Sequence, residues 1–173
     1  SFIAESMIGN ECINVTKPEV ALELFSDRRN FKLYMGDTGL LVTRIMKNRD
    51  ETDENLYKAL IIDDLGINQG MILENVVAQM LKASGHELYF HEYLYKPEGN
   101  EKEKKYEIDF ITKKKKKICP IEVKSSNYKS HKSFDYLLKK YQLKMEDRYI
   151  IYTKDLKYED GITYIPVYMT PFI

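Results

Sequence analysis

The sequence predicts an α/β fold in which helices cover both faces of a mixed central sheet. Apolar side chains recur at helical spacing over residues 68–84 and again over residues 133–143. Three segments between residues 87 and 125 instead alternate apolar and charged side chains, as strands do. A compact apolar segment at 148–153 follows the second helix. The predicted core is therefore ordered helix, three strands, helix, strand.

Short elements separated by polar turns are predicted for the N-terminal part. Residues 1–11 should end a helix. Residues 47–55 are charged and contain no large apolar side chain, so they mark the best boundary. We accordingly expect an N-terminal extension or linker at 1–55 and a second unit at 56–173. The other elements predicted before residue 68 are strands at 12–16, 20–25 and 31–35, a turn at 26–30, and helices at 40–46 and 56–62.

The helix at 68–84 and the elements after it have the clearest patterns. Gly85 stands where a helix C-terminus favours glycine. The predicted strands are residues 87–94, 106–112, 117–125, 148–153 and 164–168, with the second helix at 133–143. We expect the buried core to include Leu73, Val77, Leu81, Phe110, Ile121, Val123 and Ile151.

Composition limits the classes of protein to which the chain can belong. It has no run of about twenty apolar residues, so no membrane-spanning helix is predicted. Its two cysteines, Cys12 and Cys119, are far apart in sequence, and we expect a reducing, cytoplasmic setting. The net charge is zero, but residues 101–148 contain fifteen Lys and Arg against eight Asp and Glu. This excess suits a polyanionic partner such as DNA; alternatively, the lysines only make the surface hydrophilic.

Two carboxylates are predicted to meet on neighbouring strands. In a regular strand Ile108 and Phe110 point to one face, and Asp109 points to the other. In the next strand Glu122 points away from the core. If the hairpin turns on an even-length loop near Lys115, Asp109 lies opposite or diagonal to Glu122 on the same face. Such a pair is costly unless something binds it, and a divalent metal ion is the obvious candidate.

Mg²⁺ or Mn²⁺ would suit oxygen ligands of this kind. Asp109 and Glu122 would ligate the ion, the carbonyl of Val123 could add a backbone ligand, and Glu74 could reach it through water. Glu74 borders the apolar stripe of its helix, so it too needs a partner. Metal-bound water is a nucleophile near neutral pH, and Lys124 could orient it or stabilise charge on a phosphate. The alternative is a hairpin in which Lys124 pairs with a carboxylate and no metal binds.

A run of five lysines, Lys113–Lys117, lies between the two carboxylates. Five consecutive ammonium groups repel one another, so we expect an exposed turn. Because the strands that it joins carry the proposed site, the turn should project near that site. If DNA binds, the turn would contact phosphates without reading sequence. If DNA does not bind, the lysines only make the turn hydrophilic.

The order Glu74, Asp109 and Glu122-Val123-Lys124 resembles the PD-(D/E)XK nuclease superfamily, which has a restriction-endonuclease-like fold. More narrowly, the chain resembles the C-terminal domain of unknown function attached to many bacterial and archaeal AAA+ ATPases. The segments that carry this narrower resemblance are residues 32–34, 37–41, 70, 73–75, 107–110, 121–125 and 165–168. Ile108 stands where the formal motif has proline. The chain has no Gly-x-x-x-x-Gly-Lys-Ser/Thr loop, so an ATPase portion would lie upstream.

The resemblance implies an α-β-β-β-α-β core and a metal-dependent nuclease-like domain that acts on DNA, with Asp109, Glu122, Lys124 and Glu74 as site residues. The alternative is a catalytically inactive module that binds nucleic acid or docks on its own AAA+ ATPase and regulates it. The zero net charge favours this alternative, because phosphate binding usually needs a broad basic face.

Overall fold

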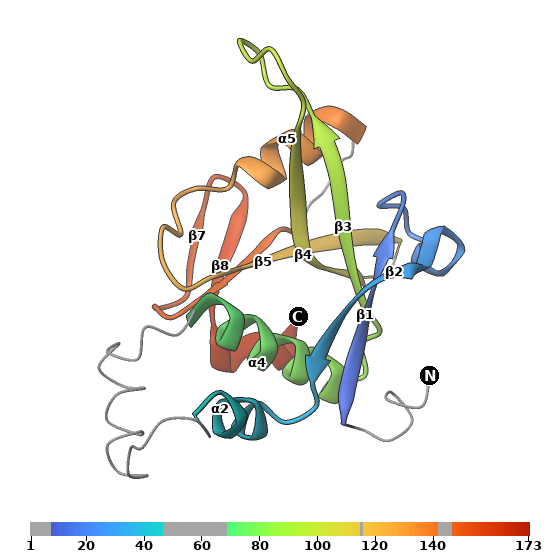
Figure 1. Ribbon diagram of the computed structural model, residues 1–173. Helices are drawn as coiled ribbons and strands as arrows, with labels where there is room; N and C mark the ends of the chain where they lie inside the picture. Colours follow the sequence, from blue (N-terminus) through green and yellow to red (C-terminus); the bar gives the residue numbers. More distant parts are fainter. Residues whose placement is uncertain (1–7, 47–68, 115, 142–146) are drawn as a thin grey trace.

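An eight-stranded mixed sheet organises the computed structural model, which describes residues 8–46, 69–114, 116–141 and 147–173 (Figure 1). The strand order is β2-β1-β3-β4-β5-β6-β8-β7. β1 pairs in parallel with β3, as do β5 with β6 and β6 with β8, and the other pairs are antiparallel. The strands are β1 Gly9–Val15, β2 Ser26–Met35, β3 Leu88–Tyr95, β4 Lys104–Lys114, β5 Lys117–Lys124, β6 Tyr149–Tyr152, β7 Lys157–Glu159 and β8 Ile162–Pro166.

Helices cover both faces of this sheet, which confirms the predicted class. On one side lie α4 (Gln69–Ala83), α2 (Thr38–Met46) and the 3-10 helix η2 (Val167–Phe172) (Figure 1). On the other side lies α5 (Lys132–Tyr141). Among the described residues, no helix is long and apolar enough to cross a membrane.

Several predictions for the N-terminal part are wrong. β1 begins at Gly9, where the end of a helix was expected. Residues 22–25 form the 3-10 helix η1 (Leu22–Phe25) and not a strand. The polar residues 26–30 belong to β2, because an edge strand tolerates side chains that face water on both sides. The boundary at 47–55 and the helix at 56–62 lie outside the described residues, and the short strand β7 was not predicted.

A separate apolar cluster packs on each face of the sheet. The α4 cluster includes Val77, Leu81, Phe110, Ile121 and Ile151. The α5 cluster includes Phe134 and Leu137 of that helix with residues of β3, β4, β6 and β8. Two of the expected core residues, Leu73 and Val123, are only half-buried.

A bulge in β4 reverses the expected alternation of its side chains. Tyr89 pairs with Ile111 but His91 pairs with Ile108, so Asp109 and Phe110 together stand opposite one residue of β3. Ile108 consequently packs in the α5 cluster and Phe110 in the α4 cluster. The prediction that these two residues share a face is wrong, because a bulge adds one residue to one strand only.

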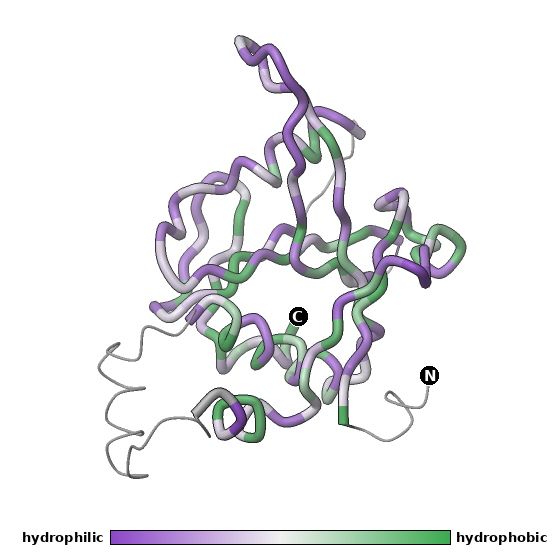
Figure 2. The backbone as a smooth tube through the Cα atoms, viewed as in Figure 1, coloured by the Kyte–Doolittle hydropathy of each residue, from purple (hydrophilic) through white to green (hydrophobic). Residues whose placement is uncertain are grey.

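The β4–β5 turn has an even length, the condition stated for the predicted carboxylate pair, since Lys114 pairs with Lys117. The described lysines of the run are exposed, as predicted. The first two also contact carboxylates: Lys113 pairs with Glu23, and the Nζ of Lys114 lies 3.5 Å from Oδ2 of Asp147. The segment that extends far from the body is instead the β3–β4 hairpin, which is hydrophilic towards its tip (Figures 1 and 2).

Asn75 fixes α4 against the end of β2. Its Oδ1 accepts a hydrogen bond of 2.8 Å from the amide of Met35, and its Nδ2 donates to the carbonyl of Met35 (3.1 Å) and to Oγ1 of Thr38 (2.8 Å). Gln79, one turn later, accepts hydrogen bonds from the amide and the hydroxyl of Thr38. Asn75 is buried, so each of its bonds replaces one that water would make.

Replacing Asn75 with alanine should therefore destabilise the protein by about 2–4 kcal/mol, because partly buried backbone and hydroxyl groups of Met35 and Thr38 lose their partners. Urea unfolding followed by circular dichroism would measure this loss. The control Lys82→Gln, on the exposed side of the same helix, should stay within about 0.5 kcal/mol of wild type. A loss below about 1 kcal/mol for Asn75→Ala would contradict the role of Asn75.

Candidate functional site

Three carboxylates converge between α4 and β4. One oxygen each from Glu74, Glu107 and Asp109 lies within 4.8 Å of the other two, and all three residues are half-buried. Glu107 and Asp109 are two residues apart on β4, and α4 brings Glu74 to the same place. Like charges so close together repel, and partial burial strengthens the repulsion. A nearby cation or protonation of one carboxyl group would relieve this repulsion.

Lys32 of β2 supplies a positive charge at this group. Its Nζ donates a hydrogen bond of 3.2 Å to Oε1 of Glu74 and another to Oε1 of Glu107. Burial alone would lower the pKa of Lys32, but Glu107, Glu74 and Asp109 outweigh it and raise this pKa. The hydroxyl of Tyr34, two residues along β2, donates to the same oxygen of Glu74.

Asp109 carries a strongly perturbed carboxyl group. Its Oδ2 accepts a hydrogen bond of 2.7 Å from the amide of Val123, which alone would lower the pKa. Burial, followed by the charge of Glu74, raises the pKa of Asp109 to about 7. The carboxyl group is surrounded by protein, yet the residue keeps some accessible surface. A group with these properties is a candidate for binding a cation or for proton transfer.

Glu122 lies outside this group of carboxylates. Its neighbours Ile121 and Val123 pack against the α4 cluster, so strand alternation turns Glu122 towards the α5 side. The expected shared face with Asp109 is not formed, because the β4 bulge turns Asp109 towards α4. The Nζ of Lys124 lies 2.7 Å from Oε2 of Glu122, whose side chain is 1% exposed. This contact lacks the alignment of a hydrogen bond, so neither oxygen of Glu122 accepts a hydrogen bond from the part of the chain that the structure describes.

Of the site residues predicted from the sequence, the structure therefore brings together Glu74 and Asp109, and it joins Glu122 to Lys124 as a separate pair. The amide of Val123 donates a hydrogen bond to Asp109, and metal ligation by its carbonyl stays a prediction. Sequence reasoning missed Lys32, Tyr34 and Glu107. The spacing of two between Glu107 and Asp109 was a usable signal for Glu107. Lys32 and Tyr34 are also two residues apart and so share a face of their strand. Nothing in the sequence indicated that this face would meet Glu74 and Glu107.

The Asp109→Asn variant should change how stability depends on pH. The folded-state pKa of about 7 exceeds the ordinary value of 3.8, so the stabilisation present at low pH is lost as the pH rises through about 7. Asparagine does not ionise and can still accept the Val123 bond. In metal-free buffer at about pH 8 we expect the variant to be more stable than wild type by about 1–3 kcal/mol. This is less than the free energy equivalent to the whole pKa shift, because Asp109 is partly exposed.

At about pH 3 the advantage of the variant should disappear, since the Asp109 carboxyl group is then protonated in both the folded and the unfolded wild-type protein. Urea unfolding at both pH values would measure these differences. A variant that is less stable than wild type at the higher pH would show that the Asp109 carboxylate is stabilising, against this account.

Comparisons with known proteins identify a family without assigning an activity. A family described as "Domain of unknown function (DUF4143)" matches residues 69–170, a segment that runs from α4 into η2 and contains the three carboxylates. No curated protein and no solved structure matches the chain. Because the matched segment is more than half of the sequence, the chain belongs to the DUF4143 family of domains of unknown function.

Proposed function

We propose that this domain hydrolyses phosphodiester bonds in DNA with the help of Mg²⁺ or Mn²⁺ bound by Glu74, Glu107 and Asp109. The observation that carries the proposal is the convergence of three half-buried carboxylate oxygens within 4.8 Å. The donor set consists of oxygen atoms, which hard divalent cations prefer. The raised pKa of Asp109 also fits, because a cation would relieve the repulsion that contributes to the shift.

The residues of the chain have distinct roles in this proposal. A bound divalent ion would supply an activated water and neutralise charge on the phosphate. The Val123 amide holds one oxygen of Asp109 and so fixes the orientation of that carboxyl group. Tyr34 holds Glu74 in the same way. Lys124, the amine expected from the sequence, pairs with Glu122 on the α5 side of the sheet, so we give it no role at the metal site on the α4 side.

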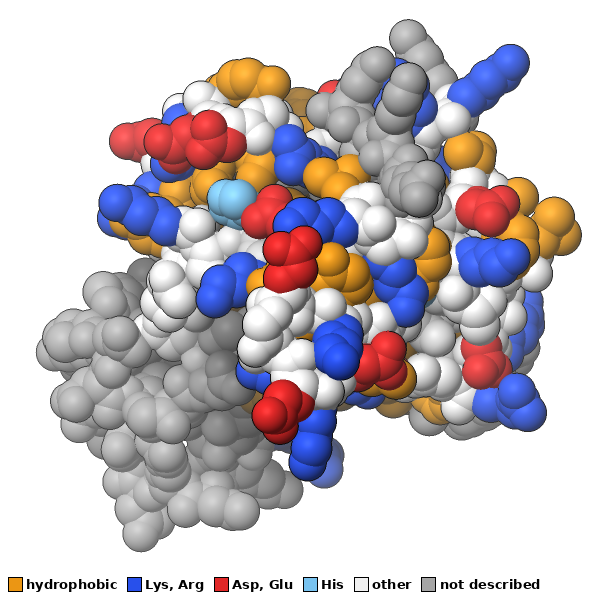
Figure 3. Space-filling view, turned by 90° about the horizontal axis from the view of Figure 1, so that it is seen from above, with side chains coloured by type: hydrophobic (Ala, Val, Ile, Leu, Met, Phe, Trp, Pro, Cys, Tyr) orange, Lys and Arg blue, Asp and Glu red, His pale blue; other side chains and the backbone are white. Residues whose placement is uncertain are grey.

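DNA is the proposed substrate because of the resemblance to nucleases and the basic excess of residues 101–148. Much of that charge is already paired, as at Lys105 with Glu92, Lys113 with Glu23 and Lys124 with Glu122. Figure 3 shows basic and acidic side chains interspersed over the face seen from above. That face therefore offers no broad basic surface, and we place the proposed contact with DNA at the site itself.

A second candidate function is a non-catalytic module that docks on an AAA+ ATPase or binds nucleic acid. A specific observation favours it: lysine ammonium groups already neutralise the carboxylates on both sides of the sheet, Lys32 at Glu74 and Glu107, and Lys124 at Glu122. Charges balanced in this way hold a fold together without any metal.

Cleavage of labelled branched and single-stranded DNA in the presence of Mn²⁺ separates the two functions. Under the first proposal, Asp109→Asn and Glu74→Gln should each lower the rate about 100-fold or more, because they remove metal ligands. The control Glu87→Gln removes an exposed carboxylate that pairs with Lys82 and should keep the rate. If the wild-type protein cuts no DNA with either metal, the enzymatic proposal fails and the docking module remains.

A further inference from the structure

Lys32 occupies the place at which a metal ion would meet two of its proposed ligands. Its ammonium contacts one oxygen of Glu74 and one of Glu107, which belong to different elements. The same ammonium lies 5.0 Å from the centre of the Phe90 ring, a cation–π contact. With its side chain 27% exposed, Lys32 is neither fully buried nor free in solvent. The acidic group is therefore already partly neutralised without any ion.

We propose that the Lys32 ammonium is a built-in competitor for the divalent cation: it holds the acidic group together in the metal-free protein and leaves when the cation binds. This inference rests on the proposed function, because it concerns the regulation of the same site. It gives Lys32 a role distinct from that of Lys124, which pairs with a carboxylate outside the group.

Competition follows from geometry and charge. Mg²⁺ binds carboxylate oxygens at about 2.0–2.1 Å, and it repels an ammonium that contacts the same oxygens. The ion and Lys32 therefore cannot share Glu74 and Glu107 in their present positions. Lysine suits such a role, because a compact charge on a flexible four-carbon stem can withdraw without a change in the backbone.

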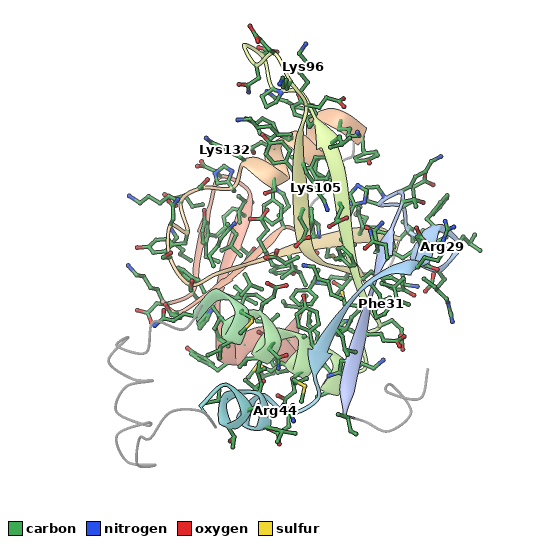
Figure 4. All side chains as sticks on the ribbon, in the orientation of Figure 1. Arg29, Phe31, Arg44, Lys96, Lys105 and Lys132 are labelled. Atoms are coloured by element: carbon green, nitrogen blue, oxygen red, sulfur yellow. The ribbon has the colours of Figure 1, made fainter. Side chains whose placement is uncertain are left out.

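The chain offers a matched control in Lys105. This lysine lies on β4 (Figure 4), two residues before Glu107. Its Nζ lies 2.6 Å from Oε1 of Glu92. Glu92 also accepts a hydrogen bond of 3.1 Å from Asn30, which like Lys32 belongs to β2. Lys105 thus forms an ion pair with Glu92 near the acidic group and contacts none of the three proposed ligands. Removing it takes away the same charge nearby but opens no coordination position.

The experiment compares Mn²⁺ binding by wild type, Lys32→Met, Lys32→Gln and Lys105→Met in titration calorimetry. We expect both Lys32 variants to bind Mn²⁺ about tenfold more tightly or better, and Lys105→Met to stay within about threefold of wild type. Thermal melting gives a second readout. Lys32→Met should melt at a lower temperature than wild type without metal, and Mn²⁺ should raise its melting temperature by more. Lys32→Gln keeps a hydrogen-bond donor and so guards against a folding defect.

The outcomes separate this inference from the proposed function. If wild type binds Mn²⁺ and the Lys32 variants bind it equally or more weakly, Lys32 does not compete, and the metal site stands. If only the Lys32 variants bind Mn²⁺, the competition is supported and the proposed function fails for the natural chain. If no protein binds Mn²⁺, both ideas are overturned, since removal of the ammonium should have exposed a site.

Discussion

The contact of the Lys32 ammonium with Glu74 and Glu107 joins three elements that are far apart in sequence: β2, α4 and β4. Three half-buried carboxylates would repel one another if no positive charge lay among them. Burial is the largest cause of the raised pKa of Asp109, and the charges of Glu74 and Lys32 shift this pKa in opposite directions. Structure and proposed function therefore meet in one electrostatic arrangement.

Two local features, a bulge in β4 and the hydrogen bonds of Asn75, determine the geometry of this arrangement. The β4 bulge turns Asp109 towards α4 and leaves Glu122 on the other side, paired with Lys124. Asn75 follows Glu74 in the sequence, and its hydrogen bonds to Met35 hold α4 against the end of β2. Neither feature adds a charge or a ligand. Both determine which carboxylates lie close enough to share a cation.

The sequence predicted the elements whose patterns come from burial on one or both faces, such as α4 and β3 to β6. The β4–β5 turn meets the condition of an even length that was stated from the sequence, but the predicted consequence, a shared face for Asp109 and Glu122, does not follow. It did not predict the bulge, because the packing of β4 against β3 sets it and the pattern of Ile108 and Phe110 is compatible with a regular strand. It did not predict the contacts of Lys32, because the place of β2 at the sheet edge depends on long-range pairing with β1.

The central claim is that Glu74, Glu107 and Asp109 together bind a divalent cation. A crystal of the full chain soaked in Mn²⁺ would test it most directly, through the anomalous signal of the metal. The account predicts a peak among the oxygens of these three residues, with Lys32 moved away from Glu74 and Glu107. A map with no peak there and with Lys32 still in contact with both carboxylates would contradict it.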